Sequence, residues 1–130
     1  MMHITIVTPK GVYKEIDATA IQFSTLEGQM TILPNHMPIV AMLKICPCTI
    51  WVNQEKQTYA LAKGVMQFAD NQMQILSDAI EYRQEIDIER AKQAKKRAEQ
   101  RLTSQDKTID YQRAKEALQK AENRIKVYEL

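Results

Sequence analysis

The chain has 130 residues, a formal net charge of +2 and a hydrophobic fraction of 45%, a composition typical of a soluble globular protein with one ordinary domain or two small ones. It contains no apolar run of about 18 residues and no signal-peptide pattern at its start, so neither transmembrane insertion nor secretion is expected. Residues 1–84 carry six Lys or Arg against seven Asp or Glu, and residues 85–130 carry twelve against nine, so the positive charge lies in the C-terminal part.

The first part of the chain, residues 3–78, predicts an antiparallel β-sandwich or barrel of short strands. Its apolar residues alternate with a period of two, which marks one buried face of a strand. The alternating pairs are Ile4/Ile6, Ile21/Phe23, Met30/Ile32, Ile50/Val52, Tyr59/Leu61, Met66/Phe68 and Met73/Ile75. Turn-forming residues separate these pairs at intervals of about 8–12 residues, as in all-β proteins.

The cysteine pair and the histidine of this region are residue types found in functional sites, but their sequence context favours a structural role. Cys46 and Cys48 flank Pro47 with no second Cys/His cluster to complete a metal site, so we expect small buried residues at a strand bend. His36 has no nearby residues for a triad and is expected to contact backbone or a neighbouring protein, while Met37 is a candidate for an exposed contact surface. With no paired carboxylates in an apolar setting and no phosphate-binding glycine loop, the chain is not expected to be an enzyme on its own.

The second part, residues 85–130, predicts an antiparallel helical hairpin. It contains no Gly or Pro, is rich in good helix formers and breaks its helical pattern at residues 103–106. The predicted seam consists of Ile88, Ala91, Ala94 or Lys95, Ala98 and Leu102 on the first helix and of Ala114, Ala117, Leu118, Ala121, Ile125 and Tyr128 on the second. Because alanine buries little area, the hairpin is expected to be marginally stable alone. The pattern fits a movable hairpin and a hairpin fixed on the sandwich equally well.

The segment IDIERA, residues 86–91, begins the first predicted helix. If Asp87 is the N-cap, Arg90 stands at the third helical position, where a capping box has Glu or Gln and where the helix dipole disfavours a cation. A nearby anion would offset that cost. Further basic residues recur along the hairpin at Arg97, Arg101, Arg113, Lys120 and Arg124.

These basic residues allow three interpretations. They form a solvated face, dock onto an acidic protein surface, or bind a polyphosphate through arginine forks. Nucleic acid is disfavoured, because the first helix has almost no aromatic residues for stacking on bases.

Four segments together reveal a family resemblance. They are ITIVTPKGVY at 4–13, EGQMTILPNHMPIV at 27–40, AKGV at 62–65, and IDIERA at 86–91 followed by AKKRAEQRL at 94–102. In their order and spacing they resemble the epsilon subunit of bacterial F-type ATP synthases along the whole chain. The sequence departs from that family at Thr31, Asn35 and Lys63, where glycines are common. Asn35 is expected to adopt a left-handed conformation readily, whereas β-branched Thr31 is not.

The resemblance implies a β-sandwich over residues 1–84 that contacts the gamma subunit and the c-subunit ring, followed by a regulatory helical hairpin over residues 85–130. It implies a non-catalytic central-stalk subunit that requires no cofactor and lies peripherally at the cytoplasmic face of the bacterial cell membrane. In family members the hairpin either folds on the sandwich or extends along gamma toward the alpha/beta hexamer. There its basic helix meets acidic beta-subunit surface and blocks ATP hydrolysis.

In some family members the folded hairpin also binds ATP, which makes ATP a candidate regulatory ligand here. Carried over by position, the implied ATP-binding residues are Glu81, Ile86, Asp87, Arg90, Ala91, Arg97 and Arg124. Lys120 stands where the best-matching relatives have arginine, so it keeps the charge without the planar fork. The alternatives are a stand-alone ATP-sensing module and a scaffold whose basic hairpin docks nucleic acid.

Overall fold

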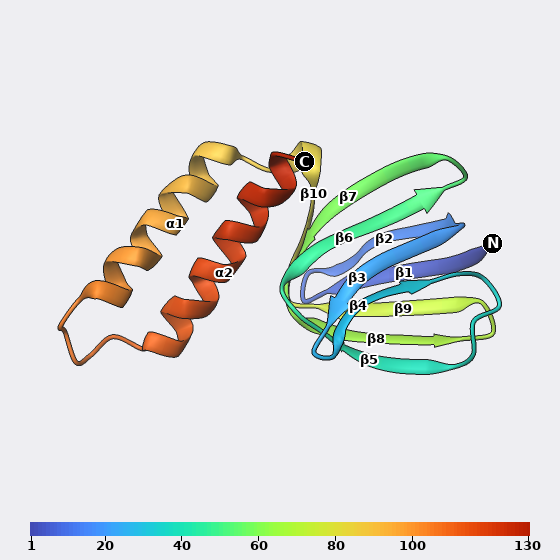
Figure 1. Ribbon diagram of the computed structural model, residues 1–130, viewed down its shortest axis with the longest axis horizontal. Coiled ribbons are helices and arrows are strands. Elements are labelled where there is room, and N and C mark those ends of the chain that lie inside the picture. The colour runs from blue at the N-terminus through green and yellow to red at the C-terminus, as the bar shows by residue number, and fades with distance from the viewer.

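The computed structural model describes residues 1–130 and consists of a β-sandwich followed by a two-helix hairpin, as predicted (Figure 1). The strands are β1 (Met2–Thr8), β2 (Gly11–Ala18), β3 (Ala20–Thr25), β4 (Gly28–Ile32), β5 (Ile39–Leu43), β6 (Cys46–Val52), β7 (Glu55–Leu61), β8 (Gly64–Ala69), β9 (Gln72–Ser77) and β10 (Ile80–Tyr82). A short 3-10 helix, η1 (Arg83–Glu85), leads into α1 (Ile88–Thr103), and α2 (Tyr111–Tyr128) runs back beside it.

The ten strands form one continuous sheet that curls into the sandwich. Its order is β10-β7-β6-β3-β5-β8-β9-β1-β2, with β4 paired to β3. Every pair is antiparallel except β1 with β9, which is parallel. This one departure from the predicted pattern arises because β1 and β9 are joined by most of the sandwich rather than by a tight hairpin. The order leaves β10 and β2 as the two end strands.

The core confirms the period-two pattern. Of the fourteen residues in the predicted pairs, twelve are buried, and only Met30 and Val52 are partly exposed. Val52 is the last residue of β6, and Cys46, Cys48 and Ile50 represent that strand in the core instead. Both cysteines are free and buried, as expected, and burial raises the pKa of both thiols.

The loop around His36 follows the sequence expectation in part. Asn35 adopts the left-handed conformation, with φ of 69°, and its backbone N–H donates to Asn71 Oδ1 at 2.6 Å. Thr31 needs no such conformation, because it lies within β4 and pairs regularly with Gln22. His36 Nδ1 donates to the Met37 carbonyl oxygen at 2.7 Å, and Met37 is 72% exposed.

The hairpin seam is alanine-rich as predicted, since Ala91, Ala98, Ala114 and Ala121 are all buried. Tyr128 is a correction to the predicted seam, because it is 42% exposed. The second helix instead buries Asn123 and Val127. The reason is that α2 packs against two surfaces, α1 on one side and the sandwich on the other, so it has a second buried stripe.

Candidate functional site

The hairpin is docked on the sandwich through α2, which packs on β6, β7 and η1. Val127 is fully buried in a small apolar cluster with Ala60 and Ile86. Asn123 is also buried, and its Nδ2 donates to the carbonyl oxygens of Cys46, at 3.0 Å, and Leu61, at 3.4 Å. Those two residues face each other in the β6/β7 pair. A polar side chain of α2 therefore fastens the hairpin to the backbone of the sheet.

Two exposed polar contacts supplement this docking. Lys63 Nζ lies 3.0 Å from Glu116 Oε1, and Arg83 Nε donates to the Tyr128 carbonyl oxygen at 3.3 Å. Glu116 raises the pKa of Lys63, whose side chain is half exposed. Because exposed ion pairs stabilise little, the docking depends mainly on Asn123 and Val127.

A cavity of about 370 Å³ lies between the docked hairpin and the sandwich, within the size range of small-molecule sites. The sandwich supplies an apolar wall that includes Ile45, Ala60, Leu61, Ala62, Ala79 and Ile80. Its charged lining consists of Glu81 on β10, Arg90 on α1, and Lys120 and Arg124 on α2. Three cations against one carboxylate make this lining positive, so the cavity suits an anion that also has an apolar part.

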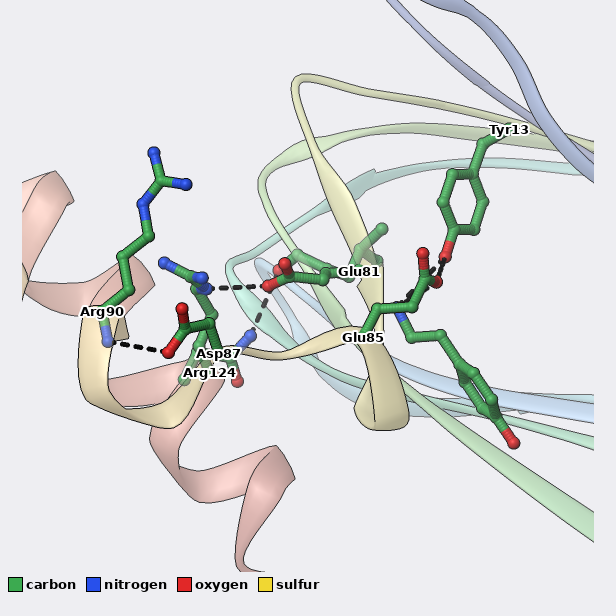
Figure 2. A network of polar contacts seen from close by, with 9 residues as sticks. Tyr13, Glu81, Glu85, Asp87, Arg90 and Arg124 are labelled. Atoms are coloured by element: carbon green, nitrogen blue, oxygen red, sulfur yellow. Dashed lines mark hydrogen bonds and ion pairs between the residues drawn. The ribbon is translucent and has the colours of Figure 1, made fainter. Parts of the chain in front are cut away.

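One cation of the cavity is held in place by the sandwich. Arg124 Nε donates to Glu81 Oε1 at 2.8 Å, with the two side chains 25% and 32% exposed (Figure 2). A guanidinium has five N–H donors in a planar fork, so this bond leaves donors for a second anionic partner. Glu81 therefore orients Arg124 and leaves it able to bind a phosphate or carboxylate.

Asp87 is the N-cap of α1, as predicted, and its Oδ1 accepts from the Arg90 backbone N–H at 3.1 Å. The Arg90 side chain forms no ion pair. The same arrangement occurs at α2, where Asp110 caps and accepts from the Arg113 N–H at 3.1 Å. Since Arg113 lies outside the cavity lining, a cation at this helix position does not by itself indicate an anion site. What distinguishes Arg90 is its place beside Lys120 and Arg124.

The implied ATP-binding residues divide into three groups. Glu81, Arg90 and Arg124 meet at the cavity together with Lys120. Ile86, Asp87 and Ala91 do not line it, but they fix the start of α1 through burial and capping. Arg97 is exposed further along α1 and is not part of the lining. The role of all seven residues in binding ATP stays a prediction.

Sequence reasoning missed Asn123 and the apolar wall. The signal for Asn123 was present, because Lys120, Asn123, Arg124 and Val127 recur at three- and four-residue spacing along one stripe of the helix. This stripe is separate from the alanine seam that faces α1. A second stripe of mixed polarity indicates a helix with two partners.

We expect Asn123→Ala to release the hairpin more often while each helix stays intact. The substitution removes the donor of two backbone carbonyls, at a cost of about 1–2 kcal/mol, or roughly five- to thirtyfold in the docking equilibrium. Hydrogen exchange of α2 amides measures the release. Gln119→Ala, on the exposed face of the same helix, is the control. Equal exchange in the two variants would show that Asn123 does not fasten the hairpin.

Comparison with known proteins agrees with this architecture. Residues 1–83 match the family described as ATP synthase, Delta/Epsilon chain, beta-sandwich domain, and residues 84–129 match its long alpha-helix domain. The chain is 39% identical over 100 residues to the ATP synthase epsilon chain of Pediococcus pentosaceus, covering 76% of this chain and 72% of that one. It is 37% identical over 107 residues to the epsilon chain of Clostridium kluyveri, covering 82% and 81%.

Solved structures show the same fold at lower sequence identity. A chain of the mitochondrial ATP synthase of Euglena gracilis, in a structure of its OSCP, F1 and c-ring, matches with a TM-score of 0.81 at 22% identity over 94% of this chain and 78% of that one. A chain of the central stalk and c-ring structure from Tetrahymena thermophila matches with a TM-score of 0.59 at 19% identity, over 98% and 93%.

A β-sandwich with a docked helical hairpin, matched by both domains in the same order, defines a delta/epsilon chain of an ATP synthase, a class of non-catalytic subunits. Within that class, the chain belongs to the ATP synthase epsilon chain family. Neither of its helices is both long and apolar enough to cross a membrane.

Proposed function

We propose that this subunit forms part of the central stalk of a proton-translocating F-type ATP synthase and couples proton flow to ATP synthesis. The sandwich contacts the gamma subunit and the c-subunit ring, so the protein lies peripherally at the cytoplasmic face of the bacterial membrane. Support comes from family membership and from fold relatives in two ATP synthase structures, one of OSCP, F1 and c-ring and one of a central stalk and c-ring. Leu33, Met37 and Val40 are large apolar residues more than half exposed around one loop, which suits a protein contact.

In this proposal the hairpin regulates the complex. When released, it extends along gamma, and its basic helices meet acidic beta-subunit surface of the alpha/beta hexamer and inhibit ATP hydrolysis. ATP binds the cavity between the docked hairpin and the sandwich and stabilises the docked form. The observation that carries this role is the convergence of Arg90, Lys120 and a Glu81-oriented Arg124 on one cavity at the junction that must separate.

The free energy by which ligand binding can stabilise the docked form is large enough to regulate the hairpin. A ligand that binds only the docked form, at 100 times its dissociation constant, stabilises that form by about 2.7 kcal/mol. The hairpin contributes little apolar burial of its own, since the side chains in its seam are mostly alanine. A shift of that size therefore moves a marginal equilibrium.

An ATP titration of the isolated protein tests the nucleotide role. With one label on the sandwich and one near the tip of the hairpin, we expect the released population to fall as ATP rises into the millimolar range. Inorganic phosphate alone is the matched control, because it supplies the negative charge without the adenine base that the apolar wall would contact. No binding at millimolar ATP would remove the nucleotide-sensing role and leave the coupling role unaffected.

Deleting residues 85–130 tests the inhibitory role in the reconstituted complex. We expect faster ATP hydrolysis, because the proposed inhibitor is the released hairpin. The sandwich keeps its own core of 18 buried residues, so assembly with gamma should persist and can be checked by co-purification. Unchanged hydrolysis by the assembled complex would contradict an inhibitory hairpin.

A further inference from the structure

A hydrogen-bonded group outside the cavity joins the sandwich to the start of the hairpin. Tyr13 lies on β2 and Tyr82 on β10, the two end strands of the sheet. The Tyr13 hydroxyl accepts from the Tyr82 backbone N–H at 3.1 Å and donates to Glu85 Oε1 at 2.5 Å (Figure 2). Glu85 Oε1 also accepts from the same N–H at 3.3 Å. We call the contact between Tyr13 and Glu85 the latch.

The sandwich holds the latch rigidly on its own side. The Tyr13 ring packs edge-on against Tyr59 with centroids 6.4 Å apart, and Tyr59 packs on Tyr82 at 5.1 Å. Lys14 Nζ lies 5.5 Å from the centre of the Tyr59 ring. Burial first, and the hydrogen bond to Glu85 second, raise the pKa of Tyr13, so its hydroxyl remains a donor at neutral pH. These contacts orient the hydroxyl toward the linker.

The other partner of the latch lies in the only covalent connection between sandwich and hairpin. Glu85 is the last residue of η1, and the next residue, Ile86, is buried against Ala60 and Val127. Val127 belongs to α2, so the segment at Glu85 and Ile86 touches both the sheet and the docked helix. When α2 separates from the sandwich, Ile86 loses its contact with Val127. The backbone just before Ile86 is then the point about which the hairpin can rotate; we call it the pivot.

The latch uses none of the cavity-lining residues. Glu81 on β10 binds Arg124, whereas Glu85 on the following η1 binds Tyr13 (Figure 2). An anion bound in the cavity would therefore act on the docked hairpin through contacts separate from the latch.

We propose that the Tyr13–Glu85 latch must open for the hairpin to leave the sandwich, so that it sets the released population in the absence of nucleotide. This rests on the proposed mobility of the hairpin. The latch makes the docked form the resting state of the free subunit, and ATP adds to that preference. Tyr13 and Glu85 are positioning residues in this scheme, since neither touches the ligand cavity.

The test is Tyr13→Phe in the full-length protein without ATP, read by hydrogen exchange of α2 amides. Phenylalanine keeps the ring packing and removes the hydroxyl. The substitution removes a hydrogen bond to a charged group at a partly exposed site. We therefore expect the exchange rate of α2 amides to rise about five- to tenfold, while the exchange rate of amides in the core strands is unchanged. Tyr111→Phe, which removes a hydroxyl bonded to the Ser104 carbonyl at the hairpin tip, is the matched control and should leave α2 exchange near wild type.

Glu85→Gln is the second variant, because it keeps an acceptor oxygen and removes the charge, and it should give a smaller increase than Tyr13→Phe. Faster exchange confined to residues 83–86, with α2 unchanged, would overturn the latch. If the α2 amides of the wild-type protein exchange only together with those of the sandwich core, the hairpin does not separate on its own, and the proposed mobility of the hairpin is contradicted. The two failures are thus distinguishable in one set of measurements.

Discussion

Gly64→Ala is expected to destabilise the sandwich by about 3 kcal/mol, the upper end of the range for overpacking a core. A β-carbon at Gly64 would overlap the Leu76 carbonyl oxygen and lie 2.9 Å from Ser77 Cα. Both obstacles are backbone of β9, which pairs with β8 at this point. No side-chain rotation can relieve the clash, so one strand must move. Urea unfolding followed by circular dichroism measures the loss as a lower midpoint at similar slope.

The displacement should also reach the cavity. Ser77 Oγ lies within hydrogen-bond distance of the carbonyl oxygens of Ala62, at 3.1 Å, and Ala79, at 3.0 Å, so its single O–H is shared between two residues of the cavity wall. Moving β9 away from Gly64 disturbs that bond set, so weaker ATP binding should accompany the lost stability. Lys63→Ala is the neighbouring control, because it removes only an exposed ion pair and should change the midpoint little. A Gly64→Ala midpoint equal to that of Lys63→Ala would show that the strands separate at negligible cost.

The strands were predictable because their signal is local. Pairs such as Ile4/Ile6 and Met73/Ile75 alternate strictly, and burial on one face of a sheet demands that period. The partner of each strand was less accessible. Ile4 and Met73 lie side by side in the parallel β1/β9 pair although 68 intervening residues separate them, and no local pattern encodes such a pairing.

In the helices too, some features follow from the local sequence and others only from tertiary contacts. Caps at Asp87 and the alanine seam follow from helix geometry. The burial of Val127 and Asn123 follows from docking on β6 and β7, which only the assembled fold reveals. Tyr128 was placed in the seam because it continues the spacing from Ile125, but it is the last residue of α2 and is 42% exposed.

The residues of the candidate site were identified from the family resemblance and not from a local sequence pattern. Its four charged groups come from β10, α1 and α2, and the recurrence of basic residues along the hairpin did not show which of them, Arg90 or Arg113 among others, share one cavity. The fold separates them, because Arg90 reaches the cavity and Arg113 does not. It also separates Arg97 from Arg124, which the resemblance treated alike. Whether a given arginine can share a ligand with another is a tertiary property.

Arg124→Ala is expected to weaken ATP binding about 100-fold, equivalent to roughly 2.7 kcal/mol. The variant removes one of three cations from the cavity and also frees the Glu81 carboxylate, which then opposes the phosphates. The two effects act in the same direction, so this substitution should exceed Arg97→Ala, whose side chain lies outside the lining. Isothermal titration calorimetry with ATP and magnesium measures both variants.

Two further variants separate phosphate binding from simple docking. Arg113→Ala makes the same charge change on the same helix outside the cavity, and it should leave ATP affinity within about threefold of wild type, since distant surface charges are largely screened. Glu81→Gln breaks the ion pair with Arg124 but keeps the guanidinium and a polar group at position 81, so its loss should be much smaller than that of Arg124→Ala. Equal losses in Glu81→Gln and Arg124→Ala would mean that the pair matters only for holding α2 on the sandwich. In that case the cations of the cavity would not be phosphate ligands, and regulation by nucleotide would need another site.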